Sequence, residues 1–324
     1  MDTQPITYVT NSSIVYIADF ETSLAAAAGC DLIFTSPPYE NARTYGNDVS
    51  WSFEDYQRLG DAAHASLKPG GHMLMVLNGP VYQWRKGKGT ERSFMPFKVM
   101  LDWAERIGFR VPDRLVYGRR GTIGRFLGRF RNDWEPLFWF QKVGGESKPF
   151  FDKTCLNEEA STKSTGAAST RLKNGNFKRR VLSGSIIAAG VRERGTLWNY
   201  SSVGGRGNDE PEAIATNHPA RFCMRLAEDV VRCFCPPGGL VCDPFVGSGN
   251  TAVASVRYGR DFVGGDLFGD SNNKSWALWT HERVIGELEK LSKETPVTIE
   301  TTDMRSDNAG QSSSIPGFTT PPEG

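Results

Sequence analysis

Short apolar runs alternate with amphipathic segments along most of this chain of 324 residues. The runs predict strands at residues 13–18, 31–35, 72–77, 115–117, 137–141, 240–242 and 261–264. Apolar positions three and four apart predict helices at residues 24–28, 51–67, 97–107, 221–233, 251–258 and 275–291. This alternation predicts an α/β protein with a doubly wound, mostly parallel sheet, in which ligands bind beyond the carboxyl ends of the strands.

The regular pattern is interrupted once and stops near the end of the chain. Between residues 143 and 215, Gly, Ser, Thr, Asn and Lys dominate, and long irregular stretches in compact domains are usually functional or disordered. Residues 295–324 are rich in Thr, Ser, Pro and Gly, which predicts a disordered tail. We therefore expect one domain in two halves, residues 1–142 and 216–294, with an irregular insertion at 143–215.

Charge is distributed unevenly, although the net charge is only +1. Between Arg85 and Arg206 there are 25 Lys and Arg against 11 Asp and Glu, whereas the rest of the chain has 13 against 26. A basic middle between acidic flanks is the footprint expected of a groove that binds a polyanion. The alternative is a solvated basic face with no partner.

The remaining composition restricts the class of protein. None of the six cysteines forms a Cys-x-x-Cys pair, and the four histidines lack metal-ligand spacing, so we expect buried thiols and no metal. No run of 18 apolar residues occurs, and the N-terminus lacks the basic and apolar regions of a secretory signal. These features predict no membrane association and a cytoplasmic location.

A glycine-rich motif follows the predicted strand at 240–242: Asp243-Pro244-Phe245-Val246-Gly247-Ser248-Gly249. Its glycines let the backbone approach a ligand, and the following helix presents free amide groups. The motif lacks the Gly-Lys-Ser/Thr of a phosphate loop, which argues against ATP. Asp266, at the end of the next strand, can accept both hydroxyls of a ribose. The alternative is a plain turn at Gly247 with Asp266 as a helix cap.

A second motif, Thr35-Ser36-Pro37-Pro38-Tyr39, follows the strand at 31–35. The prolines end the strand and stiffen the loop. Ser36 and the Pro37 carbonyl can then accept hydrogen bonds from an exocyclic amino group, which would make its nitrogen a better nucleophile. Tyr39 offers a flat face for stacking on a base. The alternative is a structural turn stiffened by proline.

Together the two motifs resemble the signatures of S-adenosylmethionine-dependent DNA amino-methyltransferases. Because the catalytic motif precedes the cofactor motif, the chain resembles the permuted β class. The likeness covers most of residues 13–290. It includes Lys68-Pro69-Gly70-Gly71, Asn132-x-x-Glu135, Asn217-His218-Pro219-Ala220 and Gly259-Arg260-x-Phe262-x-Gly264.

The resemblance implies a Rossmann-like methyltransferase fold with circularly permuted motif order and a basic target-recognition insertion at 143–215. It implies S-adenosyl-L-methionine as cofactor and a DNA base flipped out of the duplex. The implied catalytic residues are Ser36, Pro37, Pro38 and Tyr39. The implied cofactor-binding residues are Asp19, Thr35, Asn217, His218, Pro219, Asp243, Pro244, Phe245, Gly247, Ser248, Gly249 and Asp266. The chain departs from the family at Asn250, where Thr is usual, and at Asp266, where Glu is usual, and both changes keep polarity.

Within the family, Ser-Pro-Pro-Tyr commonly goes with N4 of cytosine and Asp-Pro-Pro-Tyr with N6 of adenine. Ser36 therefore favours N4 of cytosine, with N6 of adenine as the alternative. Methylation at carbon 5 is disfavoured, since it needs a Pro-Cys nucleophile that the chain lacks. An RNA or protein-amide methyltransferase and a non-catalytic DNA-binding relative also stay open. The first more often shows Asn-Pro-Pro-Tyr, and intact motifs argue against the second.

The expected macromolecular partner is double-stranded DNA. Basic side chains that would hold its backbone are Arg119, Arg120, Arg125, Arg129, Arg131, Lys178, Arg179 and Arg180. The resemblance also implies two further partners, a cognate restriction endonuclease and a second copy of the chain in a homodimer. It implies a bacterial cell or a phage-infected host.

Overall fold

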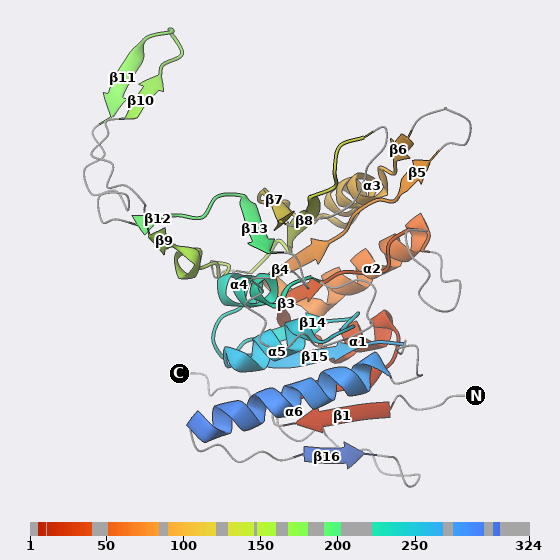
Figure 1. Ribbon diagram of the computed structural model, residues 1–324. Helices are drawn as coiled ribbons and strands as arrows, with labels where there is room; N and C mark the ends of the chain where they lie inside the picture. Colours follow the sequence, from red (N-terminus) through yellow and green to blue (C-terminus); the bar gives the residue numbers. More distant parts are fainter. Residues whose placement is uncertain are drawn as a thin grey trace.

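The computed structural model describes residues 6–10, 12–40, 51–83, 90–120, 129–145, 148–159, 168–180, 191–201, 222–267, 275–294 and 301–304. Within these residues, a ten-stranded sheet has the order β13-β7-β8-β4-β3-β14-β15-β2-β1-β16 (Figure 1). Its strands are β1 (Ile6–Thr10), β2 (Ser13–Ile17), β3 (Cys30–Thr35), β4 (Leu67–Val76), β7 (Arg114–Arg120), β8 (Trp134–Gln141), β13 (Leu197–Ser201), β14 (Leu240–Asp243), β15 (Asp261–Gly265) and β16 (Thr301–Met304). The five central strands, from β4 to β2, are parallel.

Helices cover both faces of the sheet. They are α1 (Phe20–Ala26), α2 (Phe53–Ser66), α3 (Met95–Asp102), α4 (Met224–Phe234), α5 (Asn250–Arg257) and α6 (Trp276–Glu294). Side chains alternate along β3, so Leu32 and Phe34 pack with α4 and α5 whereas Ile33 packs with α1 and α2. The predicted doubly wound, mostly parallel sheet is thereby confirmed.

Local signals explain where two of the helices begin and end. The Asp19 side chain accepts the amide of Thr22 at 2.7 Å, so α1 begins earlier than its apolar residues indicate. The predicted helix at 97–107 is α3 continued by a π-helical turn, Trp103–Ile107. This turn ends at Gly108, which has a φ of 90°. The strands predicted at 115–117 and 137–141 are β7 and β8, which pair antiparallel.

The irregular region predicted at 143–215 contains more structure than its composition indicates. β13 pairs in parallel with β7, so this segment belongs to the central sheet and the prediction of irregular structure was wrong here. Trp198 and Tyr200 are buried while Leu197 is 56% exposed, a period-two pattern too short to stand out in sequence. Two small strand pairs also occur, β9 (Glu158–Glu159) with β12 (Val191–Arg192) and β10 (Ala168–Arg171) with β11 (Phe177–Arg180). In Figure 1 the β10–β11 hairpin lies away from the sheet.

The predicted disordered tail also needs a correction. Thr301–Met304 forms β16, which pairs antiparallel with β1 at the edge of the sheet. Neither strand was predicted. β16 is the edge strand, and it obtains its backbone hydrogen bonds from β1 without an apolar run of its own. Among the helices described, none has the length and apolar content needed to cross a membrane.

Candidate active site

The two sequence motifs start side by side in the middle of the sheet. β3 and β14 are parallel neighbours, with Ile33 opposite Cys242. The Thr35 hydroxyl at the end of β3 donates to the Asp243 carboxylate at the end of β14, at 2.6 Å. The two residues are 208 positions apart in the chain, so only the fold joins them. Both loops therefore leave the same edge of the sheet, next to each other.

Asp243 is almost fully buried, at 1% exposure. Besides Thr35, its carboxylate accepts the Thr251 hydroxyl at 2.7 Å and the Phe245 amide at 3.1 Å. Burial raises the pKa of Asp243 to about 6, against the opposing effect of these three hydrogen bonds. Since both oxygens accept from the protein, the carboxylate holds together the end of β3, the glycine loop and α5.

Replacing Asp243 by Asn should change how stability depends on pH. The folded-state pKa of about 6 lies above the ordinary value of 3.8, so the folded protein binds this proton more tightly than the unfolded chain does. Ionisation of the buried Asp243 therefore lowers the free energy of unfolding. This effect is absent below about pH 4, grows as the pH rises to about 6, and is complete above that. Relative to Asp243→Asn, the wild type should lose about 3 kcal/mol of unfolding free energy across this window. Urea unfolding between about pH 3.5 and pH 7 measures this, and parallel curves for both proteins would contradict it.

The glycine loop is held against α6 by close packing. Gly247 and Gly249 have φ values of 46° and 81°, which favour glycine. A Cβ atom on Gly249 would lie 2.6 Å from the Thr280 hydroxyl of α6. That hydroxyl donates to the Gly247 carbonyl at 3.2 Å, and Arg283 donates to the Ser248 carbonyl. The backbone of the loop is therefore fixed before any ligand arrives.

Acidic residues follow the two strands beyond β14. Asp266, after β15, is 8% exposed and its carboxylate accepts the Gly247 amide at 3.0 Å. Asp19, after β2, is half-buried and caps α1. Because β14, β15 and β2 are consecutive in the sheet, the glycine loop and both acids share one edge. This arrangement matches the ribose-binding ends of nucleotide-binding sheets.

The other cofactor residues expected from the sequence divide into two groups. Phe245 is half-buried, with its ring centroid 5.8 Å from Phe20 and 5.2 Å from Trp51, while Pro244 and Ser248 are buried in the loop. The predicted residues Asn217, His218 and Pro219 lie outside the described residues.

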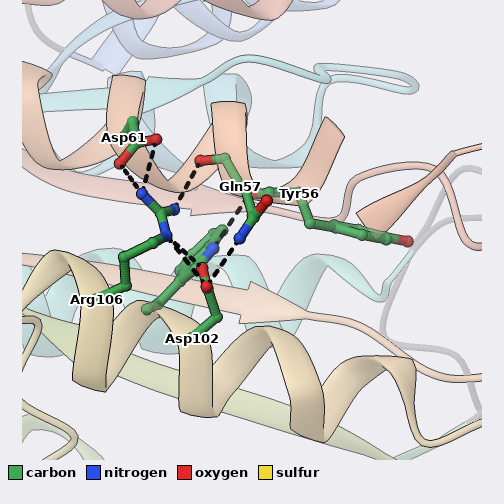
Figure 2. A network of polar contacts seen from close by, with 6 residues as sticks. Tyr56, Gln57, Asp61, Asp102 and Arg106 are labelled. Carbon is green, nitrogen blue, oxygen red and sulfur yellow. Dashed lines mark hydrogen bonds and ion pairs between the residues drawn. The ribbon is translucent and has the colours of Figure 1, made fainter. Parts of the chain in front are cut away.

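The loop Ser36–Tyr39, called the proline loop below, is held by α2, which packs on the sheet face opposite to α4 and α5. The Tyr56 hydroxyl of α2 donates to the Pro38 carbonyl at 2.7 Å, and both prolines of the loop are buried. Figure 2 shows how α2 is tied to the following helix: Arg106, in the turn that continues α3, contacts Asp61 of α2 at 2.8 Å, and Gln57 of α2 donates to Asp102 at 2.9 Å. The ion pair between Arg106 and Asp61 is exposed and contributes little by itself, but the two contacts link the helix that carries Tyr56 to its neighbour.

A buried carboxylate lies next to the proline loop. The Ser36 hydroxyl donates to the Tyr39 hydroxyl at 3.5 Å, and Tyr39 donates to Glu135 at 3.3 Å. Glu135, on β8, is 6% exposed and is paired with Arg119 of β7 at 2.9 Å. In both hydrogen bonds the hydroxyl proton points toward Glu135, so the Ser36 oxygen keeps its lone pairs available for a donor.

A cavity of about 240 Å³ opens onto this chain of residues. Its lining residues are Tyr39, Asn78, Gly79, Val81, Arg92, Arg119, Arg129, Asn132 and Glu135. The sequence indicated Asn132 and Glu135 only as part of a family motif without a role, and it gave no indication of Asn78 or Arg92. Asn78 follows the carboxyl end of β4, beside β3, and that position is the one signal that could have pointed to it.

The predicted DNA-binding residues occupy different environments. Arg119 lines the cavity and pairs with Glu135, so it lies at the site itself, and its contact with DNA stays a prediction. Arg129 and Arg131 line a second cavity of about 310 Å³, which adjoins the first. Arg120 ends β7, and Lys178, Arg179 and Arg180 lie on β11, whereas Arg125 lies outside the described residues. Nowhere in the described part of the chain do three His, Cys, Asp or Glu gather in a way that could hold a metal ion.

Known proteins share this architecture. A family model described as DNA methylase, of the N6/N4 type, matches residues 30–268. The orphan methyltransferase M.BamHII of Bacillus amyloliquefaciens is 27% identical over 242 residues, which is 73% of this chain and 83% of that protein. The structure of the cytosine-N4-specific PvuII DNA methyltransferase superposes with a TM-score of 0.57 at 19% identity, covering 87% of this chain and 93% of that one. A complex of M1.HpyAVI with SAM superposes with a TM-score of 0.51 at 20% identity, covering 83% and 98%.

The chain therefore belongs to the N6/N4 DNA methylase family, and is a DNA methyltransferase that acts on an amino group. The resemblance inferred from the two motifs is confirmed, as is the methyltransferase fold.

Proposed function

We propose that this protein transfers a methyl group from S-adenosyl-L-methionine to N4 of cytosine in double-stranded DNA. The observation that carries the proposal is the hydrogen bond from Thr35 to Asp243. It joins the loop suited to an amino group with the loop suited to a nucleotide-like cofactor. Two reagents bound to adjoining loops are close enough to react directly, with no covalent intermediate on the protein.

The glycine loop and the neighbouring acids are assigned to the cofactor. Gly247 and Gly249 bring bare backbone to the N-terminus of α5, and Asp266 places a carboxylate beside them. A carboxylate at this strand end suits the two hydroxyls of a ribose. When bound, S-adenosyl-L-methionine supplies an electrophilic methyl group. The complex of M1.HpyAVI with SAM supports this choice of cofactor.

The proline loop is assigned to the target base, which must leave the DNA stack to reach it. The Ser36 oxygen and the Pro37 carbonyl accept the two amino hydrogens, which turns the nitrogen lone pair away from the ring. After the nitrogen gains a methyl group it must release one proton. The hydrogen-bonded chain from Ser36 through Tyr39 offers that proton a route to Glu135.

Cytosine is favoured over adenine by Ser36, because the serine form of the motif commonly accompanies N4 methylation in this family. The cytosine-N4-specific PvuII structure supports the same choice. Nucleoside mass spectrometry of duplex DNA treated with the protein and cofactor tests it directly. N4-methylcytosine is the expected product. N6-methyladenine would contradict cytosine as the target base but agree with a DNA amino-methyltransferase. Methyl transfer only to RNA or protein would contradict both the target base and the class of enzyme. A cognate restriction endonuclease and a homodimer stay predictions.

Replacing Asp266 by Ala should weaken cofactor binding about 10- to 100-fold, the expected loss of hydrogen bonds to a charged group. Isothermal titration of the cofactor into wild type and variant measures the effect. Asp266→Asn is the matched control, since it keeps an oxygen that can accept the Gly247 amide. Unchanged affinity in Asp266→Ala would exclude a contact between this residue and the cofactor.

A further inference from the structure

Phe130 is an apolar side chain held in solvent at the edge of the site. At 96% exposure it is the most exposed large apolar side chain in the described part of the protein. It lies between Arg129 and Arg131, in the segment that leads into β8. One exposed phenylalanine needs no explanation by itself. Its position relative to the two cavities, however, suggests a function.

Phe130 lines the second cavity, beside the one that holds Tyr39 and Glu135. The two cavities have six lining residues in common: Asn78, Gly79, Val81, Arg92, Arg129 and Asn132. Phe97 and Trp134 also line the second cavity and are 41% and 46% exposed. An aromatic surface therefore continues directly from the site assigned to the extruded base.

The segment lies at the sheet edge where the DNA must approach. β8 runs antiparallel to β4, with Leu137 opposite Val76, so β8 begins at the edge where β4 and β3 end. Ser36 follows β3 at this same edge. Arg129 and Arg131 on either side of the ring suit phosphates of the DNA backbone.

We propose that Phe130 inserts into the DNA stack at the position that the target base leaves. Extruding a base breaks its stacking and leaves a gap beside its former partner. In other DNA-binding proteins, apolar side chains such as phenylalanine insert between base steps and partly unstack them. This inference rests on the proposed function, because it requires a base that leaves the duplex.

The test compares full-length wild type with Phe130→Ala on two duplexes that carry the mapped methylation site. One is fully paired, and in the other the target base lies opposite an abasic site, where no pairing must be broken and extrusion leaves no unpaired partner base. We expect kcat/KM of the variant to fall about 10- to 100-fold on the paired duplex, the loss expected for one stacking contact. On the second duplex we expect the variant to equal the wild type. A role in folding alone would lower both values equally.

Phe94→Ala is the matched control, since Phe94 is 69% exposed and lines neither cavity. It should match the wild type on both duplexes. A 2-aminopurine at the target position gives a second readout without turnover. Its fluorescence should rise on binding to wild type and rise less with Phe130→Ala.

Two results would contradict the proposed insertion of Phe130: full activity of Phe130→Ala on the paired duplex, or an equal loss of activity on both duplexes. If the wild type methylated neither duplex, both the proposed function and the proposed insertion of Phe130 would be wrong. The comparison with wild type therefore separates the two failures.

Discussion

Replacing Ser36 by Ala should lower kcat for methyl transfer about 10²- to 10³-fold, the range seen when one preorganised hydrogen-bonding group is removed from a transition state. The hydroxyl oxygen is the acceptor assigned to the amino group, and its proton is directed away toward Tyr39. Cofactor affinity should not change, because the glycine loop has its own contacts to α6. Single-turnover kinetics and cofactor titration separate the two effects.

Tyr39→Phe is the informative companion to this variant. It removes the hydroxyl that contacts Glu135 but keeps the ring, so its loss in kcat should be smaller than that of Ser36→Ala. If Ser36→Ala kept wild-type kcat, the assignment of the proline loop to the amino group would be wrong. Equal loss of kcat and cofactor affinity would show instead that Ser36 supports the whole site.

Replacing Gly249 by Ala should damage both stability and cofactor binding. A side chain at a φ of 81° costs about 1–2 kcal/mol. The new methyl group would also lie 2.6 Å from the Thr280 hydroxyl. Overpacking of this kind adds about 1–3 kcal/mol. Because the loop must move to relieve the contact, the cofactor should no longer bind measurably.

Gly259→Ala is the control for Gly249→Ala. Gly259 has a φ of 67°, but a Cβ atom there would meet nothing within 4 Å. It should show the backbone cost alone, with normal cofactor affinity. Urea unfolding and cofactor titration of both variants make the comparison. Equal effects at the two glycines would mean that packing against α6 does not shape the cofactor loop.

The sheet core could be predicted from sequence because its strands are buried on both faces. β3 and β14 each contain three consecutive apolar residues, 32–34 and 240–242, and each is followed by residues that end a strand: two prolines after β3, and a proline and glycines after β14. β13 was missed because its burial is confined to Trp198 and Tyr200. Its stability depends on pairing with β7, which no local pattern reveals.

The motif residues of the site could be found, but not the contacts that the fold makes between them. Glu135 lies 96 positions from Tyr39 and reaches it because β8, β4 and β3 are neighbours. Arg119 was predicted as a phosphate contact, yet β7 and β8 place it against Glu135. Charge and composition give the number of basic residues, whereas only the sheet decides which of them enter the cavity.

The most direct test is a crystal structure of the protein with duplex DNA containing the methylation site and sinefungin, an unreactive analogue of the cofactor. The target base should lie outside the duplex, with its amino nitrogen about 3 Å from the Ser36 oxygen. The amine of sinefungin, which stands in place of the transferable methyl group, should lie on the other side of that nitrogen, next to the glycine loop. A base bound away from Ser36, or an analogue bound away from Gly247 and Asp266, would contradict the account.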